Sequence, residues 1–150
     1  MSARVIVTGS RVWSDADAIG AALLEAWHDA CQVGHDGIVV VHGAAPGADS
    51  LADLWAIGHR GLGVDRDPYP ADWSQCGPEC RPECRPGHRR ERRGGGEYCP
   101  TAGHRRNQAM VDAGALLCLA FPIGESTGTR DCMRRAVAAG IPVRDLGAQR

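Results

Sequence analysis

The sequence contains no lysine, only one phenylalanine and no long hydrophobic run. All 17 basic residues are therefore arginines, and 18 acidic residues bring the formal net charge to -1. This balance excludes a uniformly basic nucleic-acid binder. No apolar run approaches the roughly 20 residues of a membrane span, and no export signal is visible at the N-terminus. We therefore expect a cytoplasmic protein without a membrane partner.

The 150 residues are 43% hydrophobic, which is enough to form a buried core. We expect one domain spanning residues 1–150. The seven cysteines stand out in a cytoplasmic chain. Because that compartment keeps thiols reduced, a cluster of cysteines there favours metal binding over disulfides.

Strand and helix patterns alternate along the chain, which predicts an α/β fold with about five parallel strands flanked by helices. Apolar, β-branched runs predict strands at residues 4–8, 38–42, 64–69, 115–121 and 141–143. Prolines in the run at 64–69 favour an edge position. Helical spacing predicts four helices: one opened by a capping box of Ser14 and Asp17, and others at 49–59, at 102–113 and after residue 130.

A turn with no large side chains connects the strand at 38–42 to the next helix. Gly43 and Gly47 allow backbone angles and close approaches that a Cβ would block. The helix that follows directs its free N–H groups into the turn, which is the physical basis of a phosphate or other anion site. The alternative is a tight connection with Asp49 as the helix N-cap and no ligand.

Three such turns, at 8–11, 43–49 and 124–130, each follow a strand and precede a helix. In a parallel sheet they meet beyond the carboxyl ends of the strands, where ligands bind. They offer backbone N–H groups, hydroxyls and guanidinium groups suited to phosphate. The predicted ligand-binding residues in these turns are Gly9, Ser10, Arg11, Gly43, Ala44, Gly47, Ala48, Asp49, Ser126, Thr127, Gly128, Thr129 and Arg130.

Five motifs in order resemble the SLOG superfamily, and most closely its cpYpsA-related, YspA-like branch. They are Val-Thr-Gly-Ser-Arg at 7–11, His-Gly-Ala-Ala-Pro-Gly-Ala-Asp-Ser-Leu-Ala at 42–52, Tyr-Pro-Ala-Asp-Trp at 69–73, Ala-Gly-His-Arg-Arg-Asn-Gln-Ala-Met at 102–110 and Gly-Thr-Arg-Asp at 128–131. The resemblance implies a Rossmann-like core that binds a nucleotide or nucleotide-derived ligand. It also implies that Asn107 and the neighbouring Arg106 face the pocket.

The superfamily also includes the Lonely Guy phosphoribohydrolases and the Rossmann core of DNA-processing protein A. The Lonely Guy signature, Pro-Gly-Gly-x-Gly-Thr-x-x-Glu, is matched here at Pro122, Gly128 and Thr129, but Cys132 stands in place of the glutamate. Asp131 is adjacent, and one residue along a helix turns a side chain by roughly 100°. The comparison therefore favours phosphate binding without hydrolysis, as in a sensor or signal-sequestering module.

A nucleotide-processing hydrolase remains the alternative, so whether the protein is an enzyme stays open. Asp49 and Asp72 are the candidate acids or bases of such a hydrolase. The alternative is that both have only structural roles, Asp49 as a helix cap and Asp72 as a turn residue.

An insertion at about 74–100 is rich in arginine, glycine, proline and cysteine. Cys76, Cys80, Cys84 and His88 are spaced by four, and Cys99 follows. Thiolates with an imidazole suit a structural, tetrahedral Zn²⁺. We prefer the set Cys76, Cys84, His88 and Cys99, with Cys80 as the replacement. The alternative is a loop with unligated thiols. Cys31, Cys118 and Cys132 fit helix or strand patterns and are predicted to be core residues.

Arginines gather around this insertion, at 81, 85, 89, 90, 92, 93, 105 and 106. Together with zinc they suggest nucleic-acid binding as a second alternative. The scarcity of aromatic residues there counts against single-strand binding. Because lone Rossmann-like cores often pair, we also expect a homodimer.

Overall fold

The computed structural model describes residues 1–77, 80 and 89–147. Its main sheet has five parallel strands in the order β3-β2-β1-β6-β7. The strands are β1 (Ala3–Gly9), β2 (Ile38–His42), β3 (Val64–Pro68), β6 (Leu117–Phe121) and β7 (Val143–Asp145). The predicted α/β class, the five parallel strands and the edge position of β3 are confirmed.

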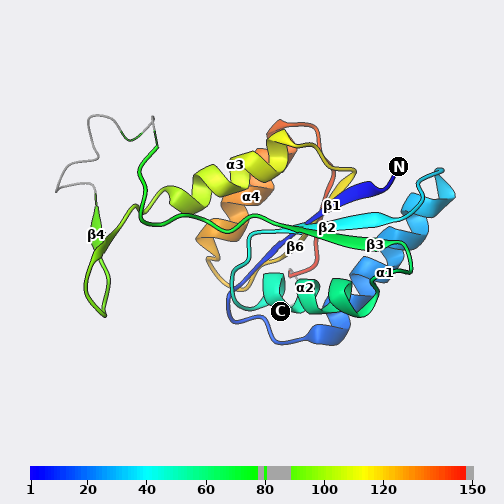
Figure 1. The fold of residues 1–150 in the computed structure, drawn as a ribbon, viewed down its shortest axis with the longest axis horizontal. Helices are drawn as coiled ribbons and strands as arrows, with labels where there is room; N and C mark the ends of the chain where they lie inside the picture. Colours follow the sequence, from blue (N-terminus) through cyan, green and yellow to red (C-terminus); the bar gives the residue numbers. More distant parts are fainter. Residues whose placement is uncertain (78–79, 81–88, 148–150) are drawn as a thin grey trace.

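Four helices cover the two faces of this sheet (Figure 1). On one face lie α1 (Ala16–Gln32) and α2 (Ala48–Gly58), and on the other lie α3 (Ala102–Asp112) and α4 (Thr127–Ala138). No helix formed by residues 1–77, 80 and 89–147 is long and apolar enough to cross a bilayer. A small hairpin of β4 (Arg90–Glu91) and β5 (Glu97–Tyr98) projects beside α3 and was not predicted.

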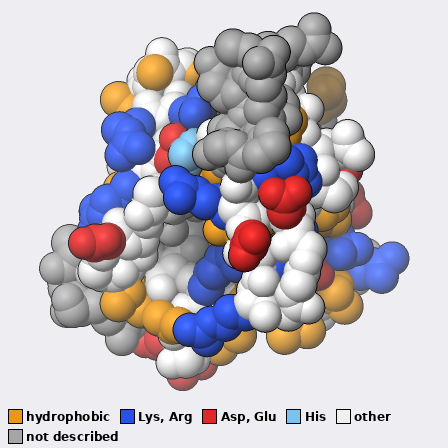
Figure 2. Space-filling model, turned by 90° about the vertical axis from the view of Figure 1, so that its left-hand side faces the viewer, with side chains coloured by type: hydrophobic (Ala, Val, Ile, Leu, Met, Phe, Trp, Pro, Cys, Tyr) orange, Lys and Arg blue, Asp and Glu red, His pale blue; other side chains and the backbone are white. Residues whose placement is uncertain are grey.

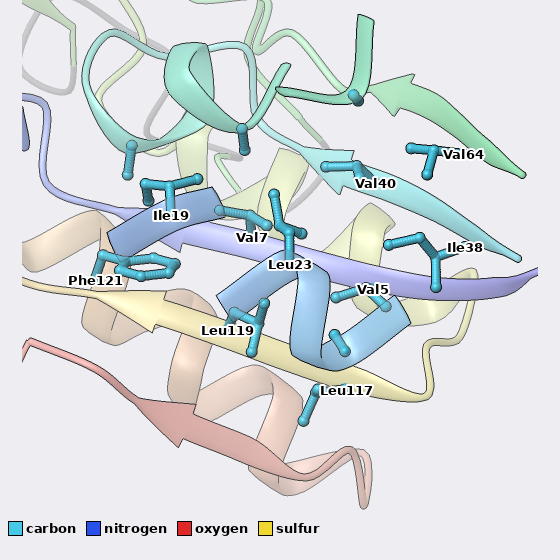
Figure 3. Close-up of a cluster of buried hydrophobic side chains, with 14 of the residues drawn as sticks. Val5, Val7, Ile19, Leu23, Ile38, Val40, Val64, Leu117, Leu119 and Phe121 are labelled. Atoms are coloured by element: carbon cyan, nitrogen blue, oxygen red, sulfur yellow. The ribbon is translucent and has the colours of Figure 1, made fainter. Parts of the chain in front are cut away.

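The central strand β1 is buried on both faces over residues 5–8, as its apolar run Val5-Ile6-Val7 predicts. Val5 and Val7 pack with Leu23 of α1 on one side, in the cluster drawn in Figure 3. Ile6 points to the opposite side and packs with Met110 of α3. This alternation follows from the two-residue period of a strand, and it fixes both helical layers to one strand.

Two predicted helix starts and one predicted strand are corrected by the structure. Asp15, rather than Ser14, is the N-cap of α1, and its side chain accepts a hydrogen bond from the Ala18 N–H. Gly47, rather than Asp49, is the N-cap of α2. The last strand begins at Val143 instead of Ile141. In each case the pattern located the element, and local hydrogen bonding shifted its boundary.

The order of the strands reverses between β1 and β6. The chain leaves β1 through α1 toward β2 on one side, whereas β6 and β7 lie on the other. Helices on opposite faces therefore diverge at the carboxyl ends of β1 and β6, which opens a crevice there. The turns that follow these two strands border it.

The close approach of β1 to its neighbours makes Gly9 sensitive to substitution. A Cβ on Gly9 would overlap the Cβ of Ala48 and lie 2.9 Å from the Cβ of Phe121. We expect Gly9→Ala to lower the free energy of unfolding by about 1–3 kcal/mol, because overpacked cores must shift backbone. Urea unfolding measures this. Gly58→Ala is the matched control, since its Cβ meets open space and alanine favours a helix; an equal loss in both variants would contradict the packing argument.

Candidate ligand site and thiol cluster

An open cavity of about 770 Å³ lies at the crevice beyond β1 and β6. Its lining comes from the turns after these strands, from the start of α3 and from the insertion between β3 and α3. Figure 2 views this side of the molecule and shows blue side chains, all arginines in a chain without lysine, around a hollow. The lining arginines are Arg11, Arg92 and Arg106. The site is therefore concave and positively charged at its rim, which suits an anionic ligand.

Most of the ligand residues predicted from the sequence line this cavity. They are Gly9, Ser10, Arg11, Asp49, Arg106, Asn107, Ser126, Thr127, Gly128 and Thr129. The remaining five lie outside the lining: Gly43, Ala44, Gly47, Ala48 and Arg130. In the turn at 43–49, only Ala45 and Asp49 line the cavity. The rest of this turn lies outside the lining and supports it through Asp49.

The first turn of α4 supplies the strongest anion-binding feature. Ser126 is its N-cap and has a left-handed φ of 38°, which an L side chain rarely adopts. Its hydroxyl donates to the Ile123 carbonyl and accepts from the Ile123 N–H, so the turn is held in place. The first N–H groups of a helix have no partner within the helix, and here they belong to cavity-lining residues. Backbone donors and the helix dipole together favour a bound anion.

The side chain of Arg106, on α3, lines the cavity and extends to the turn after β2. One guanidinium nitrogen donates to the Gly43 carbonyl, and Nε donates to the Asn107 side chain at 2.9 Å. A Cβ on Gly43 would overlap this guanidinium group, so the glycine makes room for it. Burial lowers the pKa of Arg106, although nearby Asp49 opposes that shift. The cation is thus partly desolvated, and a ligand anion would gain more from it than from a surface arginine.

Asp49 is the buried acid of the site, with 5% of its surface exposed. Its Oδ2 accepts hydrogen bonds from the N–H groups of Gly43 at 2.9 Å and Ala45 at 3.3 Å, which fold the turn around it. Its Oδ1 has no hydrogen-bond partner in the part of the chain that the structure describes. Burial raises the pKa of Asp49, and the hydrogen bonds and the charges of His42 and Arg106 only partly offset this.

The raised pKa of Asp49 leads to a pH-dependent stability difference. The folded state holds the proton more tightly than the unfolded state, so stability falls as pH rises from about 4, the unfolded value, through the folded pKa. Asparagine in its place does not titrate. We therefore expect the stability of Asp49→Asn, relative to that of the wild type, to increase as pH rises through the folded pKa of Asp49 and then to stay constant. Urea unfolding between pH 4 and 8 measures this difference. A constant difference, or one of opposite sign, would contradict the burial argument.

Asn107 ties the start of α4 to α3. Its Nδ2 donates to the Gly128 carbonyl at 3.1 Å and to Oδ2 of Asp131 at 3.0 Å. Burial alone would raise the pKa of Asp131, but hydrogen bonds from Arg135 and Asn107 bring it below its usual value. Asp131 therefore lies in a structural network and outside the cavity lining. Cys132, at the position of the Lonely Guy glutamate, is fully buried and also outside the lining.

An aromatic wall from the insertion completes the cavity and was missed by the sequence reasoning. Trp73 and Tyr98 line it, with ring centroids 6.0 Å apart in an edge-to-face arrangement. The Arg11 guanidinium lies over the Trp73 ring, 5.9 Å from its centroid. The motif at 69–73 contains the tryptophan, and its place just after the carboxyl end of an edge strand could have identified it.

Other candidate residues have structural partners. Arg130 donates to the carbonyls of Gly124 at 2.9 Å and Glu125 at 3.0 Å, and so closes its own turn. His42 is buried, bonds Asp53 through Nε2 at 2.7 Å and accepts from the Ala44 N–H. Asp72 accepts hydrogen bonds from the N–H and the hydroxyl of Ser74, which is the structural role of a turn residue predicted as the alternative to catalysis.

Three cysteines of the insertion form a thiol cluster, defined here as Cys76, Cys80 and Cys99. Their sulfur atoms all lie within 4.8 Å of one another, and Cys80 and Cys99 are 3.7 Å apart. The replacement ligand Cys80 is thus in the cluster, whereas Cys84 and His88 lie outside the described residues. Three close thiols could hold a metal ion. Cys118 and Cys132 are buried as predicted, but the prediction for Cys31 is wrong, because the outer face of α1 exposes it.

A parallel α/β fold with a cavity suited to anions, at the place where the order of the strands reverses, is typical of Rossmann-like proteins. A family model described as "YspA, cpYpsA-related SLOG family" matches residues 3–75. The Gene 61 protein of Mycobacterium phage D29 is 43% identical over 146 residues, which cover 96% of each chain. The chain belongs to the YspA, cpYpsA-related SLOG family, as its motifs predicted.

Proposed function

We propose that the protein binds a nucleotide or nucleotide-derived ligand in this cavity and acts as a sensor or signal-sequestering module. One observation carries the proposal: the first turn of α4 and the arginines at 11, 92 and 106 border the same cavity. Helix-start N–H groups and guanidinium groups both bind phosphate in proteins, and here they border one cavity. The volume of about 770 Å³ is within the range of small-molecule sites. Membership of the SLOG family supports the same class of ligand.

Calorimetric titration of the purified protein with inorganic phosphate, AMP and ADP tests this proposal. We expect a nucleotide to bind more tightly than phosphate alone. Arg11→Ala should weaken that binding by roughly ten-fold or more, since hydrogen bonds to charged groups contribute about 1.5–3 kcal/mol. Arg60→Ala, which removes an exposed arginine outside the cavity lining, is the matched control. Absence of nucleotide binding, or equal effects of the two variants, would contradict the proposal.

A hydrolase of the Lonely Guy kind is the second candidate, and buried Asp49 is the observation that favours it. A carboxyl group with a raised pKa in a ligand cavity is a common general acid. Chromatographic detection of free base released from AMP, abolished in Asp49→Asn, would support this activity. Binding of AMP without release of base in the wild type would leave the sensor function.

Nucleic-acid binding through the arginines near the insertion has weaker support. Arg105 donates to the Gln75 carbonyl and to the thiol cluster, and Arg89 donates to Cys76. These two guanidinium groups are used within the protein and are less available to phosphate. A steep loss of affinity with salt that is insensitive to Arg11→Ala would favour a nucleic-acid partner instead.

We further propose that the thiol cluster binds a structural zinc ion, with Cys84 or His88 as the fourth ligand. Zinc–sulfur bonds of about 2.3 Å at tetrahedral angles separate two sulfurs by about 3.8 Å, close to the 3.7 Å between Cys80 and Cys99. Native mass spectrometry of protein purified without chelator would show one zinc per chain, lost on denaturation. A bare chain mass would refute the zinc site. The same spectra test the expected homodimer.

A further inference from the structure

The outer wall of the cavity, defined here as Trp73, Tyr98 and Pro100, comes from the insertion and not from the sheet. Arg92 of the hairpin also lines the cavity, and the rest of the lining comes from the ends of β1 and β6, from Ala45 and Asp49 after β2, and from α3 and α4. Since an enclosed ligand would contact both parts, its affinity depends on how firmly the insertion holds this wall in place.

Trp73 of the wall packs against a small hydrophobic cluster within this part of the chain. Buried Cys80, Cys99 and Ala102 form it, with Ala71, Trp73 and Cys76 packed against them. The two large clusters on the faces of the sheet contain none of these residues. Because three of the six members are the cysteines of the thiol cluster, little apolar material remains to order the wall. A bound metal ion would supply that energy.

Cys99 connects the thiol cluster directly to the wall. It lies between Tyr98 and Pro100 in the sequence, is fully buried, and donates its N–H to the Trp73 carbonyl at 2.7 Å. The backbone at Cys99 is therefore linked to all three wall residues, by the chain to Tyr98 and Pro100 and by this hydrogen bond to Trp73. Trp73 also packs beneath Gly103 at the start of α3, where a Cβ would approach its ring to 3.0 Å.

Two guanidinium groups donate hydrogen bonds to the three sulfurs of the thiol cluster. Arg89 donates to the Cys76 sulfur at 3.3 Å. Arg105 donates to the sulfur of Cys80 at 3.4 Å and to that of Cys99 at 3.6 Å. In a zinc–thiolate centre these guanidinium groups would offset the negative charge of the ligating sulfurs.

We infer that metal occupancy of the thiol cluster orders the outer wall of the cavity, so that the protein binds its nucleotide ligand tightly only when the metal is present. This inference rests on the proposed ligand and zinc sites and adds the regulation of one by the other. Metal supply would then control ligand capture.

The wall can be observed without any ligand by ¹⁹F NMR of protein labelled with 5-fluorotryptophan. Trp73→Phe identifies the resonance of Trp73, and the tryptophans at 13, 27 and 55 are internal references in the core and on α1 and α2. We expect one equivalent of Zn²⁺, added to chelator-treated protein, to shift and sharpen the Trp73 resonance alone. Cys99→Ser should abolish this response, and Cys31→Ser, at an exposed cysteine of α1, should retain it. The affinity for ADP should fall at least ten-fold in the metal-free protein.

The outcomes separate this inference from the proposals on which it rests. If Zn²⁺ does not bind, or binds while the Trp73 resonance and the ADP affinity stay unchanged, the inference is overturned. If ADP binds neither form but the Trp73 resonance responds to Zn²⁺, the nucleotide proposal fails while metal control of the wall is supported. Because the chelator experiment uses the wild-type chain, the result does not depend on whether Cys99→Ser folds.

Discussion

Replacing Gly43 with alanine should weaken nucleotide binding by about ten-fold or more while the protein stays folded. The added Cβ would occupy the space of the Arg106 guanidinium, which is the far end of a flexible side chain. The arginine can move aside without shifting the backbone, but it then leaves the Gly43 carbonyl and its position at the cavity. Losing one charge-assisted contact to phosphate costs about 1.5–3 kcal/mol.

A double-mutant cycle checks this mechanism by calorimetry. If Gly43→Ala acts by displacing Arg106, then Arg106→Ala should weaken binding by a similar factor, and the combined variant should be little weaker than either. Additive losses would show that the two residues act independently. A large drop in melting temperature of Gly43→Ala would show that the backbone, and not the arginine, yields.

Replacing Asn107 with aspartate should be the most damaging isosteric change in the site. The variant loses the donor to Asp131 and to the Gly128 carbonyl, and it places two carboxylates side by side in a buried position. We expect the free energy of unfolding to fall by about 3 kcal/mol, because a buried like-charge contact is costly and two side-chain hydrogen bonds are lost. Ligand affinity should fall as well, since the lost amide donor holds the Gly128 carbonyl at the start of α4, beside the cavity.

The next residue offers a matched control for the added charge. Gln108 lies partly exposed on α3, where it contacts Arg135 and Asp112. Gln108→Glu makes the same amide-to-carboxylate change, and the like charge at Asp112 should cost only about 0.2–0.5 kcal/mol. Urea unfolding compares the two variants. Equal losses would contradict the buried network around Asn107.

The fold and the position of the cavity were predictable because their signals are local. Uninterrupted apolar strands such as 117–121 identify a parallel sheet buried on both faces, and the turns that follow mark its carboxyl edge. The rule that ligands bind where the strand order reverses then brings the turns after β1 and β6 together, as observed. The resemblance to the family added Arg106 and Asn107, which no local pattern would have selected.

The rest depends on contacts between distant segments. Nothing in the sequence around Gly43 shows that Arg106, 63 residues later, fills the space above it. The wall formed by Trp73 and Tyr98 depends on how the insertion folds back on α3, and the insertion has no helix or strand pattern in its sequence. Ser14 and Asp15 are adjacent residues that can both cap a helix, and the structure uses Asp15 where the sequence predicted Ser14. Cys31 was predicted to lie on the buried face of its helix, but it faces solvent.

Chemical-shift mapping of the ¹⁵N-labelled, zinc-loaded protein with ADP tests the central claim most directly. If the cavity holds the nucleotide, the largest changes should fall on the amides of residues 127–129 at the start of α4, and on residues 9–11 and 106–107. Changes confined to the hairpin residues outside the lining, at 89–91 and 93, or no change at millimolar ADP, would contradict it. The first pattern would place the phosphate on the arginines of the hairpin, and the second would leave the cavity without a nucleotide ligand.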